Sequence, residues 1–235
     1  MYLGGMDFLV IYDMDDTLYN EFDYVESGLQ AVAQIIASRS NFDETYILSK
    51  LVRTLTQDGR AAVFQTTLRE LGIKGISSSE LLRVYRNHSP NISLFPDAKA
   101  TITATKELTS RPAYVVTDGN RLVQRRKANA LQLPSLVQRV YYSRDFGIIN
   151  EKPSDKVFRR IANLEGLDLK NLVYVGDDPT KDFKALVSKG GLGIRKLGGR
   201  LHKLPNDIAN PPSYSINSLS ELPGLLKWHF KLTSS

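Results

Sequence analysis

The sequence of 235 residues alternates short apolar runs with longer segments of helical periodicity. Runs rich in β-branched and aromatic residues predict strands, whereas apolar residues at every third or fourth position predict helices. The predicted strands are Phe8–Tyr12, Ala113–Thr117, Arg139–Ser143, Leu172–Val175 and, with a weaker signal, Leu192–Arg195. The predicted helices are Ala98–Leu108, Arg121–Leu131, Lys156–Leu164 and Lys181–Ser188. This alternation predicts an α/β fold in which a parallel sheet carries helices on both faces.

One long segment interrupts the alternation. Strand signals disappear from Phe22 to about Asn87, and apolar residues there recur at helical spacing. The periodic apolar positions are Leu29, Val32, Ala33 and Ile36, followed by Leu48, Leu51, Val52 and Leu55. We therefore predict a unit of four helices and two domains, an α/β core of residues 1–19 and 96–235 and a helical domain of residues 20–95.

The composition, with 42% apolar and 24% charged residues, is that of a globular protein. The chain has no cysteine, which excludes disulfides and cysteine-bound metals, and no apolar run approaches the roughly 20 residues of a membrane span. The short N-terminal apolar stretch begins and ends beside acidic residues, unlike a signal peptide. We expect a cytoplasmic protein with no membrane partner.

The net charge of +6 is unevenly distributed. The segment Asn20–Phe95 holds eight basic and eight acidic residues, so the whole excess lies in the predicted core. A basic surface attracts phosphorylated molecules and also binds polyanions weakly, without sequence preference. Because no nucleic-acid recognition module is present, we expect no specific nucleic-acid partner.

Candidate site residues stand at or just after the ends of three of the predicted strands, and one more stands in a later loop. They are Asp13, Asp15, Asp16 and Thr17 after the first strand, Thr117, Asp118 and Gly119 at the second, Lys152 before Pro153, and Gly176, Asp177 and Asp178 at the fourth. In open parallel sheets, ligands bind beyond the C-terminal ends of the strands. We therefore expect one site that gathers these residues.

These four motifs, in this order, resemble those of the haloacid dehalogenase-like hydrolase superfamily. That pattern is D-x-D-x-T, a Ser or Thr after the second strand, a Lys, and G-D-x-x-x-x-D. The residues that fall on it are Asp13, Asp15, Thr17, Thr117, Lys152, Asp177 and Asp182. The resemblance extends from about Asp7 to about Ile194, apart from the helical insertion. It implies a doubly wound, Rossmann-like sheet with a helical cap domain inserted after the first motif.

The resemblance also implies that Asp13 and Asp15 are catalytic. Asp13 would attack phosphorus and form an aspartyl-phosphate. Asp15 would protonate the leaving oxygen and later deprotonate water, which requires a raised pKa. An acid at position 15 favours phosphatases over dehalogenases, whose leaving group needs no proton. Thr17 would orient Asp15; the ordinary alternatives are a strand-end turn for Asp13 and a turn hydroxyl for Thr17.

The expected phosphate-binding residues are Thr117, Asp118 and Lys152. Thr117 and the amide of Asp118 would bind the phosphoryl oxygens, and Lys152 would bridge Asp13 and the phosphate. In the alternative, Thr117 or Asn120 caps the following helix, and Lys152 is a surface lysine.

We expect Mg²⁺ as the cofactor, held by Asp13, Asp177, Asp178 and the backbone carbonyl of Asp15. Magnesium prefers oxygen ligands and would offset the charge of ionised aspartates and a phosphate dianion. The three histidines are scattered singly, which argues against zinc or copper. Asp182 would support the site, orienting water or Lys152. Asp178, which precedes a proline, is an equally good helix cap.

The predicted function is Mg²⁺-dependent hydrolysis of a small phosphorylated metabolite. A phosphosugar mutase of the same family and a non-catalytic protein that binds a phosphorylated ligand are the alternatives. The apolar residues of Leu219–Lys231 are compatible with packing on the core and with pairing two subunits, so the sequence leaves the oligomeric state open.

Overall fold

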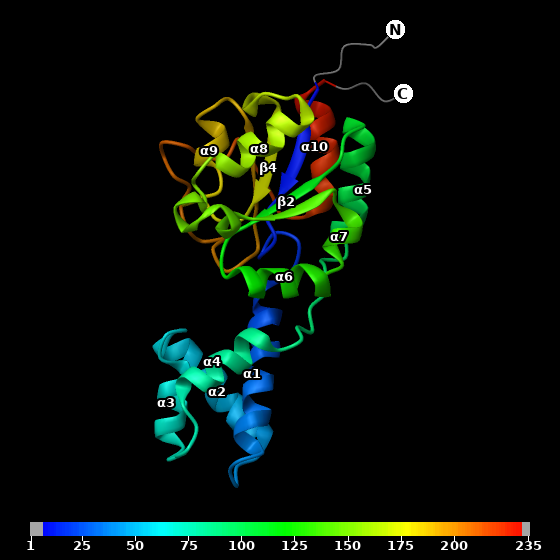
Figure 1. Cartoon of the computed structure of the whole chain (residues 1–235). Helices are drawn as coiled ribbons and strands as arrows, with labels where there is room; N and C mark the ends of the chain where they lie inside the picture. The colour runs from blue at the N-terminus through cyan, green and yellow to red at the C-terminus, as the bar shows by residue number, and fades with distance from the viewer. Residues whose placement is uncertain (1–6, 232–235) are drawn as a thin grey trace. The chain divides into compact units, whose positions relative to one another are not determined.

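The computed structural model describes residues 7–231, which form two compact units (Figure 1). One unit joins the described residues up to Glu21 to the segment that starts at Ser93, and the other is Phe22–Ile92. The domain boundaries predicted from the sequence lie two or three residues from this division.

The first unit is built on a sheet of six parallel strands. They are β1 (Leu9–Tyr12), β2 (Tyr114–Thr117), β3 (Arg139–Tyr142), β4 (Leu172–Gly176), β5 (Leu192–Lys196) and β6 (Tyr214–Ile216). Their order across the sheet is β3-β2-β1-β4-β5-β6, and every neighbouring pair is parallel. The winding reverses between β1 and β4, which is where ligands bind in such sheets. The predicted doubly wound α/β fold is confirmed.

Helices cover both faces of this sheet. They are α5 (Ala98–Thr109), α6 (Arg121–Ala130), α7 (Leu133–Leu136), α8 (Lys156–Glu165), α9 (Lys184–Val187) and α10 (Leu222–His229). Short 3₁₀ turns are η1 (Ser143–Phe146), η2 (Ile148–Asn150), η3 (Leu169–Asn171) and η4 (Leu219–Glu221). Residues of α8 and α9, including Phe158 and Leu186, pack with alternate residues of β1, β2 and β4 on one face. On the other face, the hydroxyls of Tyr12 in β1 and Thr105 in α5 lie 2.7 Å apart.

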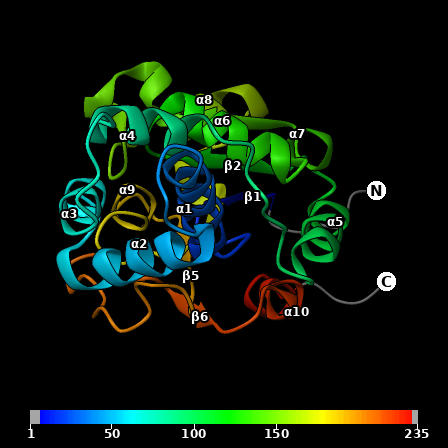
Figure 2. The same ribbon diagram turned by 90° about the horizontal axis from the view of Figure 1, so that it is seen from below.

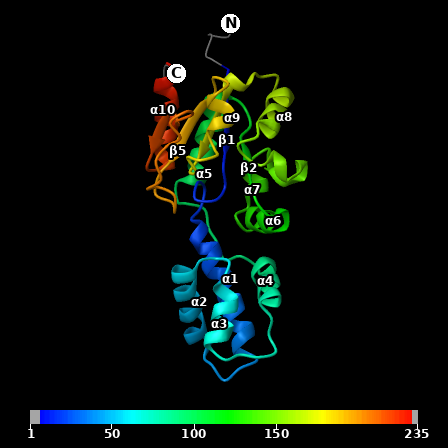
Figure 3. The ribbon, with the colours of Figure 1, turned by 90° about the vertical axis from the view of Figure 1, so that its left-hand side faces the viewer.

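The C-terminal segment packs on the core. Leu222 and Leu226 of α10 are buried, and the ring of Phe230 stacks on Phe8 with centroids 3.9 Å apart. Figure 2 shows α10 beside α5, and Figure 3 shows α10 and α8 on opposite sides of the strands. Of the two arrangements left open by the sequence, this structure supports packing on the core.

The sequence does not predict helices α7 and α10, and its predictions also differ from the structure at β6 and α9. The sequence gives no signal for β6, because three residues after a Pro-Pro pair are too few to show a period of two. Helix α9 was expected over residues 181–188 but is only four residues long. Before it, the Asp178 side chain accepts the amide of Thr180, and the Asp182 side chain accepts the amide of Asp178, both at 2.9 Å. These contacts fold the preceding residues into turns.

The second unit consists of helices, as the periodicity predicts. They are α1 (Glu21–Ala37), which starts in the last residue of the first unit, α2 (Glu44–Asp58), α3 (Val63–Glu70) and α4 (Ser78–Asn87). Asp43 and Ser77 accept backbone amides at the first turns of α2 and α4. The four helices share a buried apolar core that includes Leu29, Leu51, Leu68 and Leu81.

None of the helices between residues 7 and 231 is both long and apolar enough to cross a membrane.

Candidate active site

A cavity of about 320 Å³ opens at the C-terminal ends of β1, β2 and β4. All the predicted site residues line it except Thr17 and Asp182, which are fully buried. The lining residues are Asp13, Asp15, Asp16, Glu21, Thr117, Asp118, Gly119, Glu151, Lys152, Asp177, Asp178, Lys181, Arg200 and Leu201. Eight of these are acidic and three are basic, so an anionic ligand requires added positive charge.

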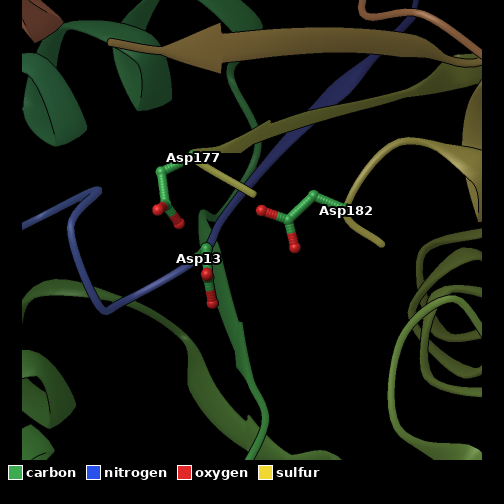
Figure 4. A group of neighbouring side chains, drawn as sticks. All are labelled: Asp13, Asp177 and Asp182. Atoms are coloured by element: carbon green, nitrogen blue, oxygen red, sulfur yellow. The ribbon is translucent and has the colours of Figure 1, made fainter. Parts of the chain in front are cut away.

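Three buried carboxylates form the centre of the site (Figure 4). Asp13 follows β1, Asp177 follows β4, and Asp182 lies in the turns before α9. One oxygen from each can be chosen so that all three lie within 4.8 Å of one another. The amide of Asp13 donates to the carbonyl of Val175 at 2.8 Å, which extends the β1–β4 pairing by one residue.

Lys152 is buried among these carboxylates. Its Nζ lies 3.0 Å from Asp13 Oδ1 and 2.7 Å from Asp182 Oδ1, and it donates to the Tyr174 hydroxyl at 2.7 Å. Burial alone would lower the pKa of Lys152, but Asp13 and Asp182 hold that pKa well above its ordinary value. The alternative of an ordinary surface lysine is wrong, because the side chain is only 1% exposed.

The carboxylates of the site are buried and lie close to one another, which opposes their ionisation. Burial raises the pKa of Asp13 to about 7, although Lys152 acts in the opposite direction. Burial and the neighbouring Asp13 and Asp182 raise the pKa of Asp177 to about 9. Carboxylates in this situation favour a bound cation, and an all-oxygen donor set suits Mg²⁺. The residues present therefore fit the expected metal.

Mg²⁺ affinity is expected to increase from pH 6 to pH 9. Below about pH 9, a metal must displace a proton from Asp177, and below about pH 7 it must also displace one from Asp13. For each proton displaced, the affinity for Mg²⁺ falls roughly tenfold with every unit by which the pH is lowered. Isothermal titration of Mg²⁺ into metal-free protein at several pH values measures this. Asp177→Asn should weaken binding and flatten the dependence above pH 7; equal affinity at pH 6 and pH 9 would contradict the assignment.

Asp15 is turned toward α6. Its Oδ1 accepts hydrogen bonds from the Tyr19 hydroxyl at 2.5 Å and from Lys127 at 2.8 Å, and its Oδ2 accepts one from Gln124 at 2.7 Å. Burial opposes ionisation, but Lys127 and these hydrogen bonds bring the pKa of Asp15 below its ordinary value. The expected raised pKa is therefore not found in this structure, because three donors surround the carboxylate.

Thr17 does not orient Asp15. Its hydroxyl is fully buried and has no hydrogen-bond partner among residues 7–231. The residues that hold Asp15 were not identified from the sequence. Gln124 and Lys127 occupy positions three apart on α6, a spacing that places them on one face of the helix, and this is the signal that could have found them.

In the second motif, Asn120 and Thr117 have different contacts. Asn120 caps α6 by accepting the amides of Leu122 and Val123, so the cap expected of Thr117 or Asn120 belongs to Asn120. Thr117 is buried, and its hydroxyl accepts a hydrogen bond from Gln124 at 2.7 Å.

Asp118 is held by its side chain. Its Oδ1 accepts hydrogen bonds from Ser143 at 2.6 Å and from the amide of Lys152 at 3.2 Å. Its Oδ2 lies 3.3 Å from Lys181. Lys181 was not predicted, and it brings a second lysine to the cavity.

Asp178 does not cap a helix, because α9 starts six residues later and Asp178 Oδ1 accepts the amide of Thr180. The residue lines the cavity, and its role as a metal ligand stays a prediction. Asp16, whose φ is +53°, accepts the amides of Glu21 at 2.9 Å and Arg200 at 3.1 Å. It thereby fixes one wall of the cavity.

The chain is similar to known phosphatases and to solved structures of hydrolases. A curated relative, the glyceraldehyde 3-phosphate phosphatase of Methanocaldococcus jannaschii, is 27% identical over 223 residues, covering 93% of this chain and 96% of the relative. The phosphoglycolate phosphatase of Neisseria meningitidis is 26% identical over 225 residues, covering 91% of each chain. A magnesium-bound structure of a putative HAD-hydrolase from Bacillus subtilis has a TM-score of 0.65 at 19% identity, covering 93% of this chain and 98% of that one.

A profile of the family described as haloacid dehalogenase-like hydrolase matches residues 10–190, which span all four motifs. The match includes the reactive residues after β1, β2 and β4. It confirms the family and the enzyme class predicted from the sequence: this chain belongs to the haloacid dehalogenase-like hydrolases.

Proposed function

We propose that this hydrolase is a Mg²⁺-dependent phosphatase that cleaves a small phosphate monoester through an aspartyl-phosphate. The observation that carries the proposal is the buried contact of Asp13 with Lys152 beside Asp177 at the floor of the cavity. This contact supports the proposal, because the expected nucleophile, a buried cation and the expected metal ligands would act together, as phosphoryl transfer requires.

In the first step, an oxygen of Asp13 attacks phosphorus as the bond to the leaving oxygen breaks. Asp15 gives its proton to that oxygen. In the second step, water attacks the phosphorus of the aspartyl-phosphate, Asp15 takes the proton of the water, and Asp13 departs as a carboxylate. The same residue thus serves as acid and then as base.

Asp15 must carry a proton for the first step, and the donors around it favour its ionised form. A phosphate dianion entering the cavity repels an ionised carboxylate and raises its pKa. Bound substrate would therefore favour the protonated Asp15 that the first step needs. After the leaving group departs with the proton, the three donors support the carboxylate form that accepts a proton from water.

Thr117, the amide of Asp118 and Lys152 would bind the phosphoryl oxygens. Mg²⁺ would be held by Asp13, Asp177, Asp178 and the carbonyl of Asp15, and it would neutralise charge on the phosphoryl oxygens. Asp182 is a supporting residue, because Lys152 contacts its Oδ1 and the amide of Asp178 donates to its Oδ2. It fixes Lys152 and the loop that carries Asp178.

The substrate would be a small phosphorylated metabolite. A cavity of about 320 Å³ suits a ligand of modest size. The relatives are named for glyceraldehyde 3-phosphate and phosphoglycolate. The helical unit, placed in sequence between β1 and β2, would serve as the cap that selects the substrate. The cytoplasmic location stays a prediction.

Phosphate release tests the proposal. Purified protein would be assayed with p-nitrophenyl phosphate, glyceraldehyde 3-phosphate, phosphoglycolate, hexose phosphates and nucleoside monophosphates, with Mg²⁺ and with EDTA. We expect release from at least one compound that EDTA removes and Mg²⁺ restores. Phosphate transfer between two sugar positions without release would favour the mutase, and binding of phosphate compounds without either reaction would favour the non-catalytic alternative.

A further inference from the structure

The α6 side of the cavity holds a hydrogen-bond arrangement that the four motifs do not include. Gln124 is 3% exposed, and its Nε2 donates both to Asp15 Oδ2 and to Thr117 Oγ1, each at 2.7 Å. An amide nitrogen carries two hydrogens in one plane, so both are used. One side chain therefore ties the residue after β1 to the residue at the end of β2.

This double contact fixes the roles of both acceptors. Because the Thr117 hydroxyl accepts from Gln124, its own hydrogen is left to donate to another acceptor, and Thr117 lines the cavity. Because Asp15 Oδ2 accepts the second hydrogen, the plane of that carboxylate is set relative to Thr117.

The other oxygen of Asp15 is held independently. Tyr19 and Lys127 donate to Oδ1, so the carboxylate has no rotational freedom left in this state. Gly119, with a φ of +112°, lies over Gln124; a Cβ there would be 3.7 Å from its side chain. Gln124 is thus packed in place by the second motif as well as hydrogen-bonded to it.

We propose that Gln124 is a positioning residue that sets the angle between the acid/base Asp15 and the phosphoryl-binding Thr117. The inference rests on the proposed phosphatase function. The distance between the leaving oxygen and the phosphoryl oxygens is fixed within a phosphate monoester, so the two side chains that serve them must keep a fixed separation. A single amide bridging them provides it, and a misplacement of about 1 Å costs roughly 10²-fold in rate.

Leaving-group dependence separates this role from a general structural role. An alkyl phosphate expels an alkoxide that needs a proton from Asp15, whereas nitrophenolate leaves without one. Because kcat/KM reports the steps up to the departure of the leaving group, comparison of the two substrates isolates the acid. Gln124→Met keeps the length and packing of the side chain and removes both donated hydrogens.

For Gln124→Met, we expect kcat/KM to fall roughly 10²-fold with the best alkyl phosphate of the panel and less than about tenfold with p-nitrophenyl phosphate. Gln124→Glu is expected to show the same selectivity, because a carboxylate has no hydrogens to donate to Asp15 Oδ2 and Thr117 Oγ1. Gln138→Met, at an exposed position, is the matched control and should leave both values unchanged. Circular dichroism and thermal unfolding would verify that each variant is folded.

Equal losses with the two substrates, or no loss with either, would overturn the positioning role while the wild-type activity stands. Absence of phosphate release by the wild-type protein would instead remove the proposed function, and the acid role of Asp15 with it. A selective loss in Gln124→Glu alone would still support the proposal if Gln124→Met does not fold.

Discussion

Asp13→Asn is expected to lower phosphatase turnover by a factor on the order of 10⁴ or more, since an amide cannot form the aspartyl-phosphate. The fold should survive, because the amide nitrogen of residue 13 still donates to the carbonyl of Val175 and the new side chain has the same shape. Removing a carboxylate whose pKa is raised to about 7 by burial also relieves crowding beside Asp177. We therefore expect Asp13→Asn to be at least as stable as the wild type in the absence of metal above pH 7.

The direction of this expected change in stability follows from proton linkage. A carboxyl whose pKa is higher in the folded than in the unfolded state stabilises the protein below its unfolded pKa, and that contribution is lost as pH rises through about 7. Asp168→Asn, at a position where the side chain is 75% exposed, controls for the general effect of replacing an aspartate with an asparagine. Steady-state rates with a burst-phase measurement and thermal unfolding at pH 6 and pH 8.5 provide the readouts. Substantial turnover by Asp13→Asn would exclude it as the nucleophile.

Lys152→Met is expected to remove both activity and stability. The side chain is 1% exposed and lies within 3.0 Å of Asp13 and within 2.7 Å of Asp182, so a methionine leaves two buried carboxylates without their cation. Breaking a buried ion pair on one side typically costs about 3–5 kcal/mol. The cost should be larger at pH 8.5 than at pH 6, because burial raises the pKa of Asp13 to about 7 and this carboxylate can take up a proton at the lower pH. Chemical denaturation at the two pH values measures it.

Mg²⁺ provides a second test of the same residue. Added Mg²⁺ should recover part of the stability of Lys152→Met, since it replaces the lost positive charge, but should not restore turnover. Lys156→Met, four residues later and exposed at the start of α8, is the matched control and should change neither quantity. Stability equal to that of the wild type at both pH values would show that Lys152 does not neutralise the buried carboxylates.

The sheet and the family were predictable because their signals are local. Apolar runs such as Leu172–Val175 are buried in the central strands. Asp13, Thr117 and Asp177, at or just beyond the ends of β1, β2 and β4, line the cavity. β6 was missed because its three residues depend on pairing with β5, a tertiary contact with no local pattern. Helix α9 was overextended because the pattern from Lys181 is helical, while the side chains of Asp178 and Asp182 fold that segment into turns.

The sequence predicts most of the candidate residues that line the cavity, but not the hydrogen-bond partners that set their charges. The sequence identifies Asp15 as an acid but cannot show that Lys127, 112 residues away, contacts it and lowers its pKa. Tyr174 was assigned only to a strand, and yet its hydroxyl accepts a hydrogen bond from Lys152. Such partners come from elements that meet only in three dimensions. Spacing within a motif cannot reveal them.

The position of β1 in the sheet has a consequence for how the chain folds during synthesis. This first strand is central, and its register with β4 pairs Leu9 with Leu172 and Tyr12 with Val175. The segment that carries Asp13 therefore gains one neighbour, β2, near the middle of the chain and the other, β4, only after more than two thirds of it, while the helices of Phe22–Ile92 need only contacts among themselves. Contacts so distant in sequence form slowly, and domains usually fold as they emerge. We expect the helical unit to fold first and the active site to form only after β4 has been made.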